Sequence, residues 1–155
     1  MAKMRLQVKG FDEMLERVQR AGGDIDAAAR QCMEKSVRVL ESNLKKEAEA
    51  SGAPTSTVSH SVTITGNRIS GETGWKLGEY NSSNPSEGYE AMFREFGTGR
   101  YSARGKGKDR QTAAGYNRGS TEPRPFLAKA RKKSVKTIRA IQEETLQNIV
   151  KELEG

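Results

Sequence analysis

Residues 58–75 read VSHSVTITGNRISGETGW, and their pattern is typical of a pair of strands joined by a turn. Its first eight residues, Val58–Thr65, alternate and are rich in β-branched side chains, which is typical of a strand. Gly66 and Asn67 form a turn signal, after which Arg68–Trp75 returns as a second strand. The stretch therefore predicts an antiparallel β-hairpin.

Two helices are expected before the hairpin. Asp24 is suited to be the N-cap of the longer helix, which runs to about Ala50. The apolar residues of this helix recur at helical spacing and form one stripe: Ile25, Ala28, Ala29, Cys32, Val37, Leu40 and Leu44. A shorter helix begins near Phe11 and stops at Gly22, and the weak alternation of Lys3–Lys9 indicates a short strand.

The chain after the hairpin predicts a strand, a loop and a helix. After the two strands of the hairpin, Tyr89–Phe96 is a third strand candidate, because its side chains divide between two alternating faces. Residues 97–122 hold six glycines, six basic residues and almost no aliphatic ones, so they cannot bury enough apolar surface to offset their ordering entropy. We expect a long mobile loop there. Pro125 suits a helix start, and the last helix is expected from about Phe126 to Leu153.

These elements predict one α+β domain over residues 1–155. We expect a small antiparallel sheet of three to four strands, packed by two long helices. The flexible Gly-, Arg- and Lys-rich loop at 97–122 precedes the C-terminal helix. Only 34% of the residues are apolar and 6% are aromatic, so the core is expected to be modest.

The positive charge is concentrated in the last third of the chain. The formal net charge is +7. Residues 1–98 hold 13 Lys and Arg against 14 Asp and Glu, whereas residues 99–155 hold 14 against 6. Such asymmetry favours a polyanionic or acidic partner, and a solvated basic surface that only aids solubility is an equally weighted interpretation.

Three features of the sequence bear on its compartment. No segment approaches the roughly 20 apolar residues of a membrane span, so no membrane partner is expected. Met1–Gly10 contains no continuous apolar run, and we expect no secretory signal. The single cysteine, Cys32, cannot form an internal disulfide. Together these features favour a protein made in the cytoplasm.

Residues with catalytic chemistry are scarce. His60 is the only histidine and lies in a predicted strand, where a histidine is usually an ordinary edge or surface residue. Cys32 lies on the apolar stripe of a helix, and one Cys with one His cannot form a zinc site. The Gly-Thr-Gly run at residues 97–99 lacks the full spacing of a phosphate loop. We therefore expect no enzyme activity, no catalytic residues, no metal and no cofactor.

The predicted loop is the candidate contact region. Its six basic residues are the candidate partner-binding residues: Arg100, Arg104, Lys106, Lys108, Arg110 and Arg118. Tyr101 and Tyr116 interleave with them, a mixture that suits phosphate neutralisation and base stacking. A small basic nucleic-acid-binding protein is therefore one functional hypothesis.

A second hypothesis comes from an ordered set of motifs. Residues 89–99 read YEAMFREFGTG, and residues 123–130, which open the last helix, read PRPFLAKA. Residues 8–18 read VKGFDEMLERV, and a long helix, a proline and a Ser-Val-x-Ile strand follow in order. This arrangement resembles a family of small tailed-phage proteins, the tail-completion or head–tail neck proteins often described as gene-product-ten-like putative tail components.

The resemblance implies a non-enzymatic structural protein of the virion, assembled in the bacterial cytoplasm and placed at the neck or the head-proximal tail end. It implies a homo-oligomeric ring, expected to be a hexamer, in contact with neighbouring neck or tail-tube proteins. It leaves open whether DNA in the lumen is a further partner, and whether the role is neck connector or tail terminator. The motif residues expected to serve structure are Phe96, Gly97, Thr98, Pro125, Phe126 and Leu127.

Overall fold

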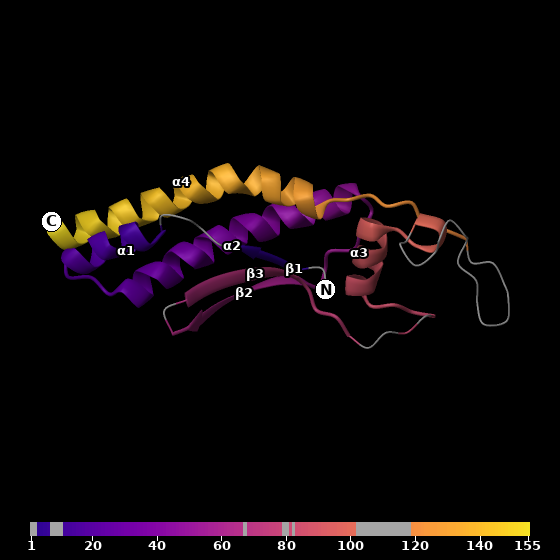
Figure 1. Ribbon diagram of the computed structural model, residues 1–155, viewed down its shortest axis with the longest axis horizontal. Coiled ribbons are helices and arrows are strands. Elements are labelled where there is room, and N and C mark those ends of the chain that lie inside the picture. Colours follow the sequence, from indigo (N-terminus) through magenta and orange to yellow (C-terminus); the bar gives the residue numbers. More distant parts are fainter. Residues whose placement is uncertain (1–2, 7–10, 67, 79–80, 82, 102–118) are drawn as a thin grey trace.

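The computed structural model describes residues 3–6, 11–66, 68–78, 81, 83–101 and 119–155 (Figure 1). In chain order the elements are β1 (Lys3–Leu6), α1 (Phe11–Arg20), α2 (Ile25–Ala50), β2 (Val58–Thr65), β3 (Arg68–Trp75), α3 (Glu87–Phe96), a 3₁₀ turn η1 (Gly99–Tyr101) and α4 (Leu127–Glu154). The chain is α+β, with an antiparallel sheet and long helices, as the sequence predicts. Most of the predicted basic loop, residues 102–118, lies outside the described residues.

The sheet has the strand order β1-β3-β2, and both neighbouring pairs are antiparallel. The predicted hairpin is confirmed at both of its strands: Val58 pairs with Trp75, and Thr65 pairs with Arg68. β1 pairs with the other edge of β3 over four residues. The upper count of four strands is not confirmed, because it needs Tyr89–Phe96, and those residues form a helix.

The prediction of a strand at Tyr89–Phe96 is wrong because the burial has a helical period. Gly88, Ala91 and Glu95 are buried at a spacing of three and four residues, so they share one face of α3. Glu87 lies in the first turn, where its negative charge is stabilised by the helix macrodipole. The aromatic residues Tyr89, Phe93 and Phe96 also recur at spacings of four and three residues, which is helical spacing, so the assumed period of two was the wrong one.

The molecule is elongated and built in layers (Figure 1). α2 lies between the sheet and α4, and α4 runs antiparallel to α2 as the outer layer. α1 lies beside the C-terminal end of α4, whereas α3 and η1 lie at the opposite end of the molecule. The residues that flank 102–118 therefore lie at one end of the molecule, and the C-terminus lies at the other end.

The larger core cluster joins α2, the sheet and the start of α4. Its buried members are Leu40, Leu44, Ala48, Ala53, Val58, Trp75, Ala91, Phe126, Ala130 and Ile138. The rings of Trp75 and Phe126 meet edge to face with centroids 5.7 Å apart. Gly71 of β3 lies where an added Cβ would be 3.0 Å from Sδ of Met33 and 3.3 Å from Cβ of Val37, so glycine permits close approach of the sheet to α2.

Polar pairs fix the alignment of α2 against α4. The Nε2 amide of Gln142 donates to Oγ of Ser36 at 3.0 Å, and both residues are buried. About two helical turns away, Nδ2 of Asn43 donates to Oγ of Ser134 at 2.9 Å. A shift of one helix along the other would leave these polar groups buried without hydrogen-bond partners. Such groups are costly in free energy, whereas apolar side chains can exchange one neighbour for another at a smaller cost.

None of the helices in the described ranges is both long enough and apolar enough to cross a membrane.

Candidate functional site

The described residues on either side of 102–118 form a hydrogen-bonded unit, which we call the clasp: residues 94–101 and 119–127. The backbone N–H of Thr98 donates to the carbonyl of Thr121 at 2.9 Å, and the N–H of Thr121 donates back to Oγ1 of Thr98 at 3.1 Å. The N–H of Arg124 donates to the carbonyl of Arg94 at 2.7 Å. The N–H of Arg100 donates to Oγ of Ser120 at 2.9 Å. These bonds hold the two ends of the intervening segment side by side.

Glu95 connects the clasp to the start of α4. This residue is only 8% exposed, and its Oε2 accepts the backbone N–H groups of Phe126 at 2.7 Å and Leu127 at 3.2 Å. Phe126 occupies the N-cap position of α4 and supplies no side-chain cap of its own. The carboxylate therefore satisfies donors that the helix start leaves unpaired, and its charge is favoured by the helix macrodipole.

Gly97 sets the path of the chain between the two halves of the clasp. Its φ is +74°, in the left-handed region that favours glycine. A Cβ at this position would lie 2.9 Å from both Cδ of Pro123 and the carbonyl oxygen of Thr121. Only glycine fits this close approach, so the Gly in the Phe-Gly-Thr run has a geometric role.

The predicted structural residues divide between the core and the surface. Phe126 is fully buried against Trp75, Gly97 and Thr98 are buried, and Leu127 is half-buried. Pro125 is exposed, and Phe96 is 58% exposed. Phe96 thus leaves an aromatic ring on the surface of the clasp.

The predicted contact residues lie mostly beyond the described part of the chain. Arg100 is exposed on η1, and Tyr101, which follows it, is 46% exposed. The other five basic residues and the second tyrosine fall within 102–118, outside the described residues: Arg104, Lys106, Lys108, Arg110, Tyr116 and Arg118. Of the predicted contact residues, the structure thus places Arg100 and Tyr101, and both belong to the clasp, as does the exposed Phe96.

Glu95 is the residue of the clasp that sequence reasoning missed. The strand prediction placed it on one face with Tyr89, Ala91 and Phe93 and gave it no role. The available signal was its spacing: Gly88, Ala91 and Glu95 share a helical face, and an acid among small buried residues indicates a specific partner. The identity of that partner, a backbone 31 residues away, is not encoded by any local pattern.

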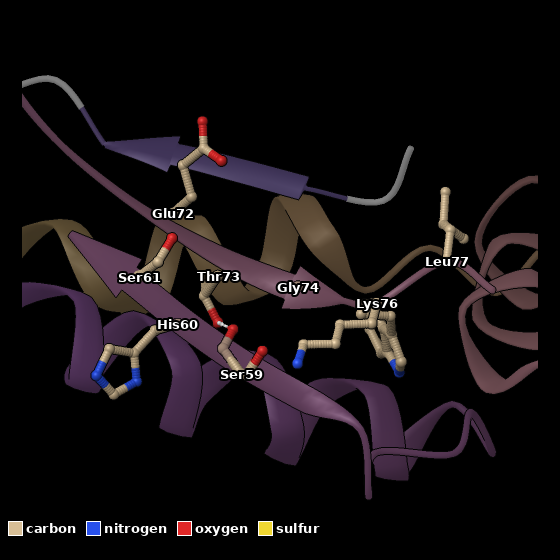
Figure 2. Close-up of a pocket in the computed structure, with 9 residues that line it drawn as sticks. Ser59, His60, Ser61, Glu72, Thr73, Gly74, Lys76 and Leu77 are labelled. Carbon is tan, nitrogen blue, oxygen red and sulfur yellow. Dashed lines mark hydrogen bonds between the residues drawn. The ribbon is translucent and has the colours of Figure 1, made fainter. Parts of the chain in front are cut away.

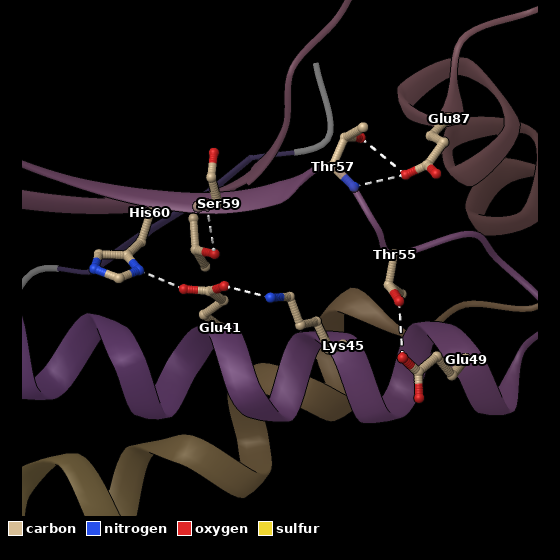
Figure 3. Close-up of polar contacts among 9 residues, drawn as sticks. Glu41, Lys45, Glu49, Thr55, Thr57, Ser59, His60 and Glu87 are labelled. Carbon is tan, nitrogen blue, oxygen red and sulfur yellow. Dashed lines mark hydrogen bonds and ion pairs between the residues drawn. The ribbon is translucent and has the colours of Figure 1, made fainter.

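Two further carboxylates connect β2 and the residues just before it to the helices (Figure 3). Glu41 of α2 contacts Nδ1 of His60 through Oε2 and Nζ of Lys45 through Oε1, the latter at 2.6 Å. Burial raises the pKa of Glu41, but the hydrogen bonds from Lys45 and His60 outweigh it, and the pKa lies below its ordinary value. Glu87 of α3 accepts from Oγ of Ser56 and from the N–H of Thr57, and these bonds lower its pKa.

A hollow of about 640 Å³ lies along β2 and β3 (Figure 2). Ser59, Ser61, Glu72 and Lys76 are among its lining residues. Figure 2 shows Glu72 and Ser61 directed away from α2, whereas His60 lies on the α2 side, where Glu41 holds it. The polar groups of this hollow therefore do not converge with the histidine on one reacting position.

The thiol of Cys32 is buried in the second core cluster, and burial raises its pKa to about 11. The thiol therefore stays protonated near neutral pH and serves packing. No group of three or more His, Cys, Asp or Glu residues that could hold a metal ion occurs within the described ranges.

None of the protein-family models, curated proteins or solved structures compared with this chain matches it. The geometry of the described residues therefore carries the functional argument.

Proposed function

We propose that the chain is a non-enzymatic structural protein of a tailed bacteriophage that completes the tail or joins head and tail as a ring at the neck. In this proposal six copies surround the tail axis and contact neighbouring neck or tail-tube proteins. The protein is assembled in the bacterial cytoplasm and remains in the virion.

The clasp is the observation that carries this proposal. The two motifs behind the resemblance, at residues 89–99 and 123–130, are separated by more than twenty residues and meet in one hydrogen-bonded unit. Phe126 anchors that unit to the core, while Arg100, Tyr101 and Phe96 lie on its surface. A rigid base at one end of an elongated molecule (Figure 1) suits a segment that engages a neighbour during assembly.

The charge distribution supports ring formation. A closed ring with more than two members needs heterologous contacts, in which one patch meets a different patch of the next copy. In this proposal the basic C-terminal third of the chain, with 14 Lys and Arg against 6 Asp and Glu, supplies one patch, and the remainder, with 13 against 14, supplies the other.

Electron microscopy of particles made without this gene tests the proposal. Deletion of the gene from its parent phage or prophage should give filled heads beside separate tails of normal length if the protein is a neck connector. Overlong tails would instead assign it as the tail terminator. Normal, joined virions would overturn the structural role.

A charge-matched pair of variants then tests the basic segment. Ser replaces five cations in the loop variant: Arg100, Arg104, Lys106, Lys108 and Arg110. Gln replaces five exposed helix cations in the control: Arg17, Arg20, Arg30, Arg38 and Lys46. Both variants should fold, and only the loop variant should fail to restore joined virions. Equal complementation by the two variants would show that the segment is not the contact.

The alternative function, a small basic nucleic-acid-binding protein, is favoured by one feature of the clasp. Tyr101 is 46% exposed and follows the exposed Arg100, as base stacking beside a phosphate contact requires. That alternative predicts tight binding of short single strands, lost when both Tyr101 and Tyr116 are replaced by Ala.

A further inference from the structure

The outer face of α4 carries a stripe of cations, which we call the α4 stripe: Lys129, Lys132, Lys136 and Arg139. The spacing of three, four and three residues puts all four on one side of the helix. All four are exposed, and the opposite side is buried through Ala130, Ser134 and Ile138. Figure 1 shows α4 as the outermost layer, so no described element covers the stripe.

The stripe has few acidic neighbours, and the nearest along the helix is Glu143, one turn after Arg139. Lys133, which lies beside it, forms an ion pair with Glu47 of α2. No ion pair joins any of the four stripe residues to an acid within the described ranges. The sequence from Pro123 to Gln142 contains no acid at all, whereas Glu143 and Glu144 begin an acidic C-terminal half.

This arrangement works against the stability of α4. Like charges three or four residues apart repel, and the stripe contains three consecutive pairs of that kind. Lys129 lies in the first turn, at the positive end of the helix macrodipole, and Glu152 and Glu154 lie at the negative end. The stripe is therefore unexplained by folding, and an anionic partner would remove the repulsion.

We propose that the α4 stripe binds the phosphate backbone of duplex DNA without reading its sequence. The stripe is linear and spans about 15 Å at 1.5 Å per residue. Duplex DNA carries roughly one negative charge per 1.7 Å of its axis, so each cation faces a phosphate-rich surface. Contacts between Lys or Arg side chains and phosphates are independent of sequence, and they supply nearly all of non-specific DNA binding.

Two other anionic partners fit less well. The centre of a protein interface is depleted in Lys and is built around large apolar anchors, whereas the stripe is cationic and is bordered by the small apolar side chain of Val135, 37% exposed. A membrane-surface helix needs a free apolar face, whereas the apolar face of α4 is buried against α2. The inference does not rest on the phage proposal, although copies in a ring would add their stripes through multivalency.

Fluorescence anisotropy of a labelled DNA duplex, measured over a salt series with the full chain, tests this inference. The stripe variant is K129Q/K132Q/K136Q/R139Q. The control is R17Q/R30Q/K46Q/K151Q, which removes four exposed cations elsewhere and leaves the same net charge. Gln keeps helix propensity, and circular dichroism checks that both variants fold.

The wild type should bind the duplex with a steep salt dependence. Loss of four phosphate contacts should reduce the slope of log K against log salt by about 3 to 4 in the stripe variant and leave the control near the wild type. Equal slopes in the two variants would overturn the inference. So would wild-type binding to polyglutamate but not to DNA, which would assign the stripe to an acidic protein. Since the readout is purified protein on DNA, its outcome is independent of virion assembly.

Discussion

A carboxylate caps the start of α2 and another caps the start of α4, but the two lie at different distances along the chain from the helix they cap. At the start of α2, Oδ1 of Asp24 accepts the N–H groups of Asp26 at 2.9 Å and Ala27 at 3.2 Å. At the start of α4, Glu95 does the same for two consecutive N–H groups, but it lies 31 residues earlier in the chain. The first cap is solvent-exposed and the second is nearly buried.

The difference separates a cap that serves one helix from a cap that organises a site. The Asp24 cap can form as soon as its own helix does, because all the groups lie within three residues. The Glu95 cap exists only after the end of α3 and the start of α4 have come together. Its loss would therefore disturb the clasp as well as the helix start.

The largest effect is expected from Phe126, the residue that anchors the distant cap in the core. Phe126→Ala removes a fully buried ring and its edge contact with Trp75, and should lower the free energy of unfolding by about 3 to 5 kcal/mol. Urea unfolding followed by circular dichroism measures this change. Phe126→Leu, which keeps most of the volume, should lose much less, and a loss below about 1 kcal/mol for Phe126→Ala would contradict the assigned packing.

Glu95→Ala tests whether the distant cap of α4 contributes more to stability than the local cap of α2. The substitution leaves two N–H groups without an acceptor in a buried position, which should cost about 2 to 3 kcal/mol. Glu95→Gln keeps an acceptor but not the charge and should lose about half as much. Hydrogen exchange at Phe126 and Leu127, measured by NMR, should accelerate in the Ala variant.

Asp24→Ala is the matched control for that experiment. A local, exposed cap is worth about 1 kcal/mol, and its loss should leave exchange at Phe126 unchanged. Equal destabilisation by the two Ala variants would mean that the distant cap has no organising role.

The smallest effect is expected from Glu41, a third carboxylate, whose partners are side chains instead of backbone groups. Its pKa is lowered in the folded protein by Lys45 and His60, so its contribution is present above the ordinary value of 4.5 and is lost as the pH falls through the folded value. Between about pH 5 and pH 3 the wild type should therefore lose more stability than Glu41→Gln. Parallel losses in urea unfolding would show that these side chains do not stabilise the fold.

The predictions from the sequence succeeded where the signals are local. The hairpin at 58–75 and the long helix that Asp24 caps follow from alternation, a turn and a capping residue within a few positions of one another. The last helix begins at Leu127, one residue after its predicted start. The strand predicted at Tyr89–Phe96 failed because eight residues are too short a window to separate a period of two from one of 3.6.

By itself, the sequence determined the α+β class, the hairpin, the long helices and the uneven charge, because each depends on periodicity, caps and counts along the chain. Only the tertiary structure decided that Glu95 caps α4, that Gly97 must fit against Pro123, and that four cations of α4 lie on an uncovered outer face. Those facts depend on which surfaces pack together, and the free energy of packing is shared among residues far apart in the chain.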